Sequence, residues 1–177
     1  MSDLISLRIV TQDDKDAILA VYRQCEDFLA LGPQPKASMA MVLGDMEMSR
    51  QRGALFCGIH DAAGRMVGVA DFTPSGYEGK PDVAFISLVM LVPELRGRGA
   101  GSEAVRLIER QIRKEPRVAT IGSAVQVNNP GAQRFWLRHG YRIIGRPELQ
   151  PDGTTVFLLR KDCRQVASRA RSSSPIG

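Results

Sequence analysis

The residues best suited to do chemistry lie in one stretch, residues 91–102, which reads LVPELRGRGAGS. An apolar run ends at Pro93, and three alternating glycines follow, which permit unusual backbone angles and close approach of a ligand. The first amides of a helix lack partners within the helix, and its dipole favours an anion there. Arg96 and Arg98 add positive charge. The pattern predicts a phosphate site formed by Arg96, Gly97, Arg98, Gly99, Ala100, Gly101 and Ser102.

Two common phosphate motifs do not fit this stretch. A dinucleotide fingerprint that starts at Gly97 would need a third glycine where Ser102 stands, and a nucleotide P-loop would need a lysine directly after Gly101. A tight glycine turn with solvated arginines remains an open alternative.

A second pattern follows downstream and gives the first one a context. Residues 125–130 read VQVNNP, and the aromatic pair Phe135-Trp136 and the dipeptide Gly140-Tyr141 come after them. Together the two patterns resemble the GNAT superfamily of N-acetyltransferases. In that family a strand ends in proline and [R/Q]-x-x-G-x-[G/A] opens a helix. The first pattern fills these three positions with Arg96, Gly99 and Gly101.

The resemblance implies an acetyl-CoA site between two central strands that splay apart. The backbone of Val89, Met90 and Leu91 would pair with the pantetheine arm like a further strand. Residues 96–102 would hold the diphosphate, and Asn129 would hydrogen-bond the arm in addition to capping a helix. The family also assigns the oxyanion donor to a backbone amide in the splayed strand, here that of Leu91.

The chain departs from the family at two catalytic positions. Trp136 stands where many members have tyrosine, and an indole N–H donates a hydrogen bond but is no usable proton source. Trp136 then packs against the cofactor, or another group protonates the thiolate. Ala124 stands where some members have a glutamate base. We expect proton removal from the amine through water, with Asp71 or Glu26 as weak candidates for the base.

These residues need a mixed α/β domain to position them. Hydrophobic periodicity and turn residues predict the order β-α-α-β-β-β-α-β-α-β-β. Strands are expected at residues 5–10, 54–60, 66–72, 83–92, 119–127, 141–144 and 154–159, and helices after Thr11, from Ser38 to about Arg52, over residues 101–112 and from Pro130 to Gly140. One parallel crossover is expected between residues 83 and 127, and the remaining neighbours are expected to pair antiparallel.

Length and charge limit the possible partners. The chain has 177 residues, which suits one domain at residues 5–162, followed by a basic tail rich in serine and arginine at 163–177. The net charge is +5, but residues 160–177 carry +4 of it, so no basic nucleic-acid face is expected on the domain. The longest apolar stretch, residues 84–93, is about half of a membrane span.

The three cysteines form no C-x-x-C pair, which predicts neither a disulfide framework nor a metal site. The first ten residues do not resemble a secretory signal, so we expect a cytoplasmic protein.

Taken together, these observations predict an N-acetyltransferase that uses acetyl-CoA as cosubstrate and a primary amine as acceptor, by direct attack in a ternary complex. The acceptor, a small molecule or a peptide, stays open, as does a homodimer. A non-catalytic acyl-CoA-binding sensor is the alternative, and a phosphate-binding nucleotide enzyme is disfavoured for want of motif lysines and acidic metal ligands.

Overall fold

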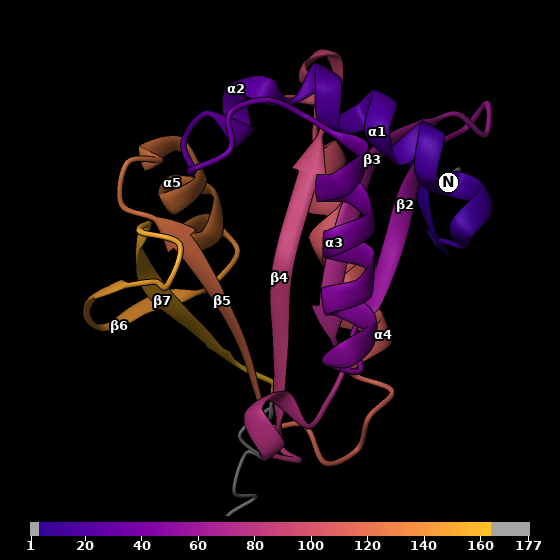
Figure 1. The fold of residues 1–177 in the computed structure, drawn as a ribbon. Coiled ribbons are helices and arrows are strands. Elements are labelled where there is room, and N and C mark those ends of the chain that lie inside the picture. The colour runs from indigo at the N-terminus through magenta and orange to yellow at the C-terminus, as the bar shows by residue number, and fades with distance from the viewer. Residues whose placement is uncertain (1–3, 164–177) are drawn as a thin grey trace, which may run out of the picture.

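One twisted sheet of seven strands organises the chain (Figure 1). The structure is a computed structural model, and it describes residues 4–163. The strands lie in the order β1-β2-β3-β4-β5-β7-β6. Their bounds are β1 Ile5–Ile9, β2 Leu55–Asp61, β3 Met66–Thr73, β4 Val83–Leu91, β5 Thr120–Gln126, β6 Arg142–Leu149 and β7 Thr155–Asp162. Only β4 and β5 pair in parallel among these strands, which confirms the predicted crossover.

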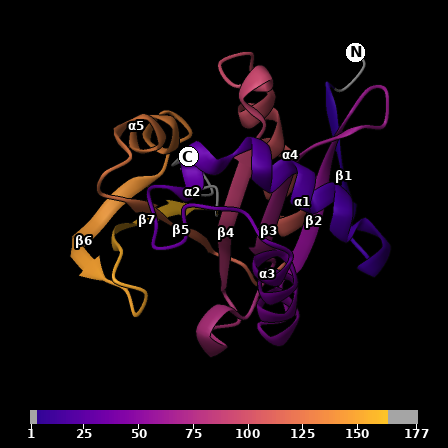
Figure 2. The same ribbon diagram turned by 45° about the horizontal axis from the view of Figure 1, so that its top comes forward.

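Helices cover both faces of the sheet, as Figures 1 and 2 show from two directions. They are α1 Lys15–Gln24, α2 Glu26–Leu29, α3 Met39–Gln51, α4 Ala100–Ile112 and α5 Pro130–Arg138, with short 3-10 turns at Gln12–Asp14, Tyr77–Gly79 and Pro93–Leu95. The helices α1 and α3 pack against β3 and β2, whereas α4 crosses behind β4 and β1. The apolar stripe of α4 is buried as its spacing predicts, at Val105, Ile108 and Ile112.

The central strands separate where the site is expected. Pairing between β4 and β5 covers only Val83–Ile86 against Thr120–Ser123. The buried hydroxyl of Ser123 donates a 2.8 Å hydrogen bond to the carbonyl of Ile86, at the last paired position. Beyond this point β4 and β5 diverge toward α2 and α5 (Figure 1). The predicted splay is thus present, and main-chain groups of β4 lose their neighbour there.

Two details differ from the sequence-based expectations, and a third expectation is not tested. The short helix α2 was not predicted, because its four residues are too few to show a helical period. Strand β6 runs to Leu149 rather than to residue 144, because a register irregularity between Ile144 and Glu148 lets pairing resume after Gly145, whose φ is 68°. The expected basic tail lies, from residue 164 onward, outside the described residues.

No helix within residues 4–163 is long and apolar enough to cross a membrane. Within the same residues, no group of three or more His, Cys, Asp or Glu side chains is arranged to hold a metal ion.

Candidate functional site

A groove of about 390 Å³ occupies the separation between the central strands. Its walls come from the end of β4, the glycine-rich turn, and the helices α2 and α5. An overlapping hollow of about 460 Å³ continues it between α2 and α5. Both share Phe28, Val89, Leu91, Arg96, Asn129 and Phe135. The structure therefore brings together the residues of the two sequence patterns, which lie far apart along the chain.

The phase of the β3–β4 ladder decides which main-chain groups face this groove. The amide of Val92 donates to the carbonyl of Val67 at 2.9 Å, and the same register pairs Met90 with Val69. Because hydrogen-bonded and non-hydrogen-bonded pairs alternate in antiparallel strands, Met90 also points its polar groups at β3, and Val89 and Leu91 point theirs away. This corrects the expectation that the backbone of Met90 pairs with the pantetheine arm, because that backbone already pairs with β3.

The carbonyl of Leu91 is also engaged, on the groove side. It accepts a hydrogen bond from Nε of Arg96 at 2.9 Å and one from Sγ of Cys25 at 3.4 Å. Burial raises the pKa of the Cys25 thiol, so the thiol keeps the proton it donates. The open groups at this edge are the amide of Leu91 and both polar groups of Val89, where β5 no longer pairs.

The glycine-rich turn presents a row of free amides. Among the described residues, none accepts a hydrogen bond from the N–H groups of residues 97–102, which precede or open α4. Gly97 and Gly99 have φ values of 70° and 86°, in the left-handed region that favours glycine. The amide of Arg96 departs from the expectation, because it donates to the carbonyl of Pro93 at 3.1 Å in the preceding 3-10 turn.

Three arginines near the groove have different surroundings. Both terminal nitrogens of Arg96 bind the carboxylate of Asp27 on α2, and this guanidinium lowers the pKa of Asp27. Arg98 is exposed and lies outside the groove lining. Arg138 of α5, which the sequence analysis did not single out, lines both hollows and forms no ion pair with any described residue.

Asn129 and Trp136 both lie on the groove wall formed by α5. The Oδ1 atom of Asn129 accepts from the amide of Ala132 at 3.1 Å and caps the helix, so its Nδ2 remains free for a ligand. Trp136 is buried and makes edge-to-face contacts with Phe135 and Tyr141. Its indole N–H has no acceptor among the described side chains and carbonyls, and Trp136 is among the residues that line the groove.

Two aromatic groove residues escaped the sequence analysis as ligand contacts. Phe135 is only partly buried and lies over Gly101, where an added Cβ would come within 3.2 Å of the ring. Phe28 comes from the unpredicted α2. Ala132, Phe135 and Arg138 recur every three residues along α5, a spacing that would have indicated this wall but was not used.

The two candidate bases lie away from the groove lining. Asp71, on β3, is buried and accepts a 2.6 Å hydrogen bond from the Ser49 hydroxyl; burial raises the pKa of its carboxyl despite that bond. Glu26 binds the Lys36 ammonium and the Ala37 amide, which lower its pKa.

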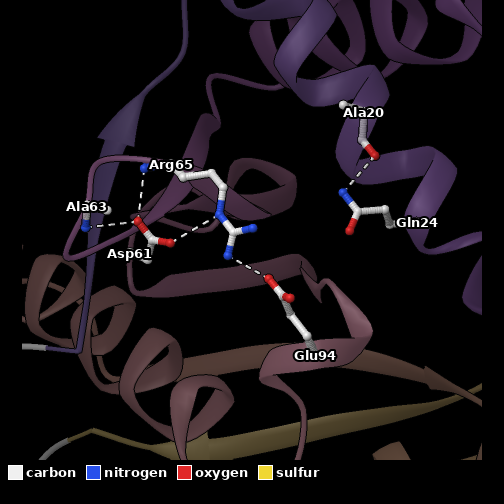
Figure 3. A network of polar contacts seen from close by, with 6 residues as sticks. All are labelled: Ala20, Gln24, Asp61, Ala63, Arg65 and Glu94. Carbon is white, nitrogen blue, oxygen red and sulfur yellow. Dashed lines mark hydrogen bonds and ion pairs between the residues drawn. The ribbon is translucent and has the colours of Figure 1, made fainter.

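The turn that leads into the free amides is tied to the β2–β3 hairpin (Figure 3). Asp61 accepts from the amides of Ala63 and Arg65 and from Nε of Arg65. The same guanidinium donates to Glu94 at 2.6 Å, within the 3-10 turn after β4. These contacts are exposed and weak singly, but they anchor the turn at a second point.

A forked sheet, unpaired strand amides and a row of free amides at a helix start together define an acyl-CoA-binding transferase architecture. The sequence profile of the acetyltransferase (GNAT) family matches residues 16–141, and the chain belongs to that family of N-acetyltransferases. No curated protein sequence matches the chain.

Solved structures share the fold at low sequence identity. An acetyltransferase from Thermus thermophilus superposes with a TM-score of 0.75 at 22% identity, over 92% of this chain and 99% of that one. AAC(6')-Ib in complex with ribostamycin and coenzyme A gives a TM-score of 0.74 at 22% identity, over 97% and 100% of the two chains. A GNAT protein from Kribbella flavida gives 0.65 at 22% identity, over 90% and 98%.

Proposed function

We propose that the protein transfers the acetyl group of acetyl-CoA to a primary amine by direct attack in a ternary complex. The observation that carries this proposal is the unpaired Leu91 amide at the open edge of β4, in one groove with the free amides of residues 97–102. One end of the groove suits a diphosphate, and the other end suits the oxygen of a thioester.

The residues around the groove suit separate parts of this cosubstrate. The polar groups of Val89 pair with the amides of the pantetheine arm as a β-strand would. Nδ2 of Asn129 donates to the same arm. The amides of residues 97–102 bind the diphosphate, and Arg138 contributes its positive charge from the opposite wall.

In the reaction, the amine nitrogen attacks the thioester carbon, and the carbonyl oxygen becomes an oxyanion. The Leu91 amide donates to that oxyanion, and an amide so placed is worth about 10²–10³-fold in rate. The C–S bond then breaks, and the thiolate leaves. The indole N–H of Trp136 stabilises the thiolate by a hydrogen bond, and the proton released from the amine passes to water.

For the base that accepts the amine proton, we propose water rather than a side chain. The carboxylates of Asp71 and Glu26 are both engaged within the chain, so we assign neither a contact with the amine. Unchanged pH–rate profiles in Asp71→Ala and Glu26→Ala would support water as the first proton acceptor. Loss of the acid limb of the profile in either variant would instead identify that carboxylate as the base.

The acceptor is proposed as a small molecule or a peptide with a primary amine. AAC(6')-Ib is seen with ribostamycin and, in another structure, with kanamycin, so aminoglycosides belong in the test panel.

The proposed location is the reducing cytoplasm. Its support is that Cys25, Cys57 and Cys163 are free thiols.

The decisive experiment is release of free CoA from acetyl-CoA over a panel of aminoglycosides, amino acids, polyamines and peptides. We expect acetyl-amine and CoA to form in equal amounts with at least one class. CoA binding by calorimetry without turnover over the whole panel would favour the acyl-CoA sensor instead.

A further inference from the structure

All three nitrogens of the Arg96 guanidinium donate hydrogen bonds within the chain. Its Nε donates to the Leu91 carbonyl, and its two terminal nitrogens hold Asp27 in a bidentate fork. Such forks fix orientation as well as charge. These bonds use three of the five guanidinium N–H groups, and the Asp27 carboxylate balances the charge. Arg138, which also lines the groove, forms no ion pair with any described residue.

Arg96 donates to the carbonyl oxygen of Leu91, and Leu91 is also the residue whose amide is open. In an extended strand the N–H and C=O of one residue point to the same edge, so fixing the Leu91 carbonyl also fixes the direction of its N–H. The Cys25 thiol donates a second hydrogen bond to that carbonyl. With two donors on one oxygen, the end of β4 is held in a single orientation toward the groove.

The same contacts join two walls of the groove. Asp27 lies on α2, whose neighbour Phe28 lines the groove, and Arg96 begins the turn that carries the free amides. The two residues are 69 positions apart in sequence, and their link sets the position of α2 relative to the end of β4.

We propose that Arg96 is a positioning residue, held by Asp27, that directs the Leu91 amide at the thioester oxygen and does not bind the diphosphate. This inference rests on the proposed function for its catalytic consequence. Its structural part, that Arg96 contributes to strand geometry rather than to coenzyme affinity, stands on the contacts alone.

The test compares Arg96→Ala and Asp27→Asn with Arg138→Ala in the full chain. Calorimetry with CoA measures affinity, and steady-state kinetics at saturating acetyl-CoA measure kcat. We expect Arg96→Ala and Asp27→Asn to change the CoA Kd by less than about 3-fold while kcat falls at least about ten-fold. Arg138→Ala should weaken CoA binding more than either variant, and its affinity should depend less on salt.

A second readout separates positioning from general loss of stability. The double variant Arg96→Ala/Asp27→Asn should lose no more kcat than Arg96→Ala alone, since the two residues act through one chain of contacts. In ¹⁵N-leucine spectra of the ligand-free protein, Arg96→Ala should shift the Leu91 amide while Tm stays within a few degrees of wild type.

Loss of CoA affinity in Arg96→Ala equal to or greater than that in Arg138→Ala would overturn the proposal, as would an unshifted Leu91 amide. If the wild-type protein binds CoA but transfers no acetyl group, the proposed function fails, and the affinity and spectral comparisons still decide the role of Arg96.

Discussion

Arginines of equal charge differ in this groove because their partners differ. Arg96 is held by Asp27 and the Leu91 carbonyl, whereas Arg138 forms no ion pair with the described residues. Charge alone therefore does not identify a phosphate ligand, and the unengaged donors of each side chain do. The same reasoning applies to Asn129, whose oxygen is used and whose nitrogen is open.

At Gly99 we expect a glutamate to abolish CoA binding. An added Cβ meets no atom within 4 Å, so the side chain would extend into open space beside the free amides and oppose the diphosphate by charge. The positive φ of 86° imposes a backbone cost of roughly 1–2 kcal/mol on any other residue.

Gly99→Ala is the matched control because it carries the same backbone strain without the charge. Calorimetry with CoA should show a small loss for alanine and no detectable binding for glutamate. Equal affinities in the two variants would contradict a phosphate site at this turn.

At Asp71 we expect a pH-dependent effect on stability. Because burial raises its folded-state pKa above the usual 3.8, the carboxyl holds its proton more tightly in the folded state. Its contribution to stability is therefore fully present below about pH 3.8 and is lost as the pH rises through the folded pKa. Asp71→Asn removes the charge and retains an acceptor for Ser49.

Thermal melts of both proteins from about pH 4 to about pH 8 check this expectation. The Tm of Asp71→Asn relative to wild type should become more favourable as the pH rises. A difference that stays constant, or that becomes less favourable to Asp71→Asn as the pH rises, would show that the folded-state pKa of Asp71 is not raised.

At the scale of elements, strand phase and helix starts select the groups that a ligand meets. Strand β4 offers alternate residues to the groove because β3 takes the others. Helix α4 begins without a side-chain cap, whereas α5 begins with Asn129 as its cap. An uncapped helix start next to a groove leaves its amides for an anion.

Two substitutions at Asn129 separate the cap from the ligand contact. Serine is a good N-cap but lacks the amide donor, and alanine lacks both. We expect Asn129→Ser to retain wild-type stability and to weaken CoA binding several-fold. Asn129→Ala should weaken binding to a similar degree and also cost about 1 kcal/mol of stability.

Urea unfolding and CoA calorimetry on the two variants supply the measurements. Wild-type affinity in Asn129→Ser would mean that this residue acts as a helix cap and nothing more.

At the scale of the whole molecule, the fork joins two halves of the sheet that share only four residue pairs between β4 and β5. A ligand that binds in the fork contacts both halves, and binding to the folded state alone raises stability by mass action. At a CoA concentration of about 100 times Kd this amounts to about 2.7 kcal/mol.

We therefore expect saturating CoA to raise Tm by about 5–10 °C, given the usual scaling for chains of this size. ATP at the same concentration is the control, since it carries phosphates without a pantetheine arm. An equal or larger shift with ATP would favour the nucleotide-enzyme alternative.

The amino-acid sequence by itself determined most of the elements and the position of the glycine-rich turn. Periodicity located α4, and the alternating glycines before it marked the free amides, because both signals are local properties of adjacent residues. The crossover, and with it the parallel pair, followed from the order of strands and helices.

Only the tertiary structure decided which groups remain open. That Met90 faces β3, that Arg96 is held by Asp27, and that Phe135 and Arg138 line the groove depend on contacts between segments distant in sequence. A hydrogen-bonding group is available to a ligand only when no other part of the fold has taken it, and that depends on how the whole chain packs.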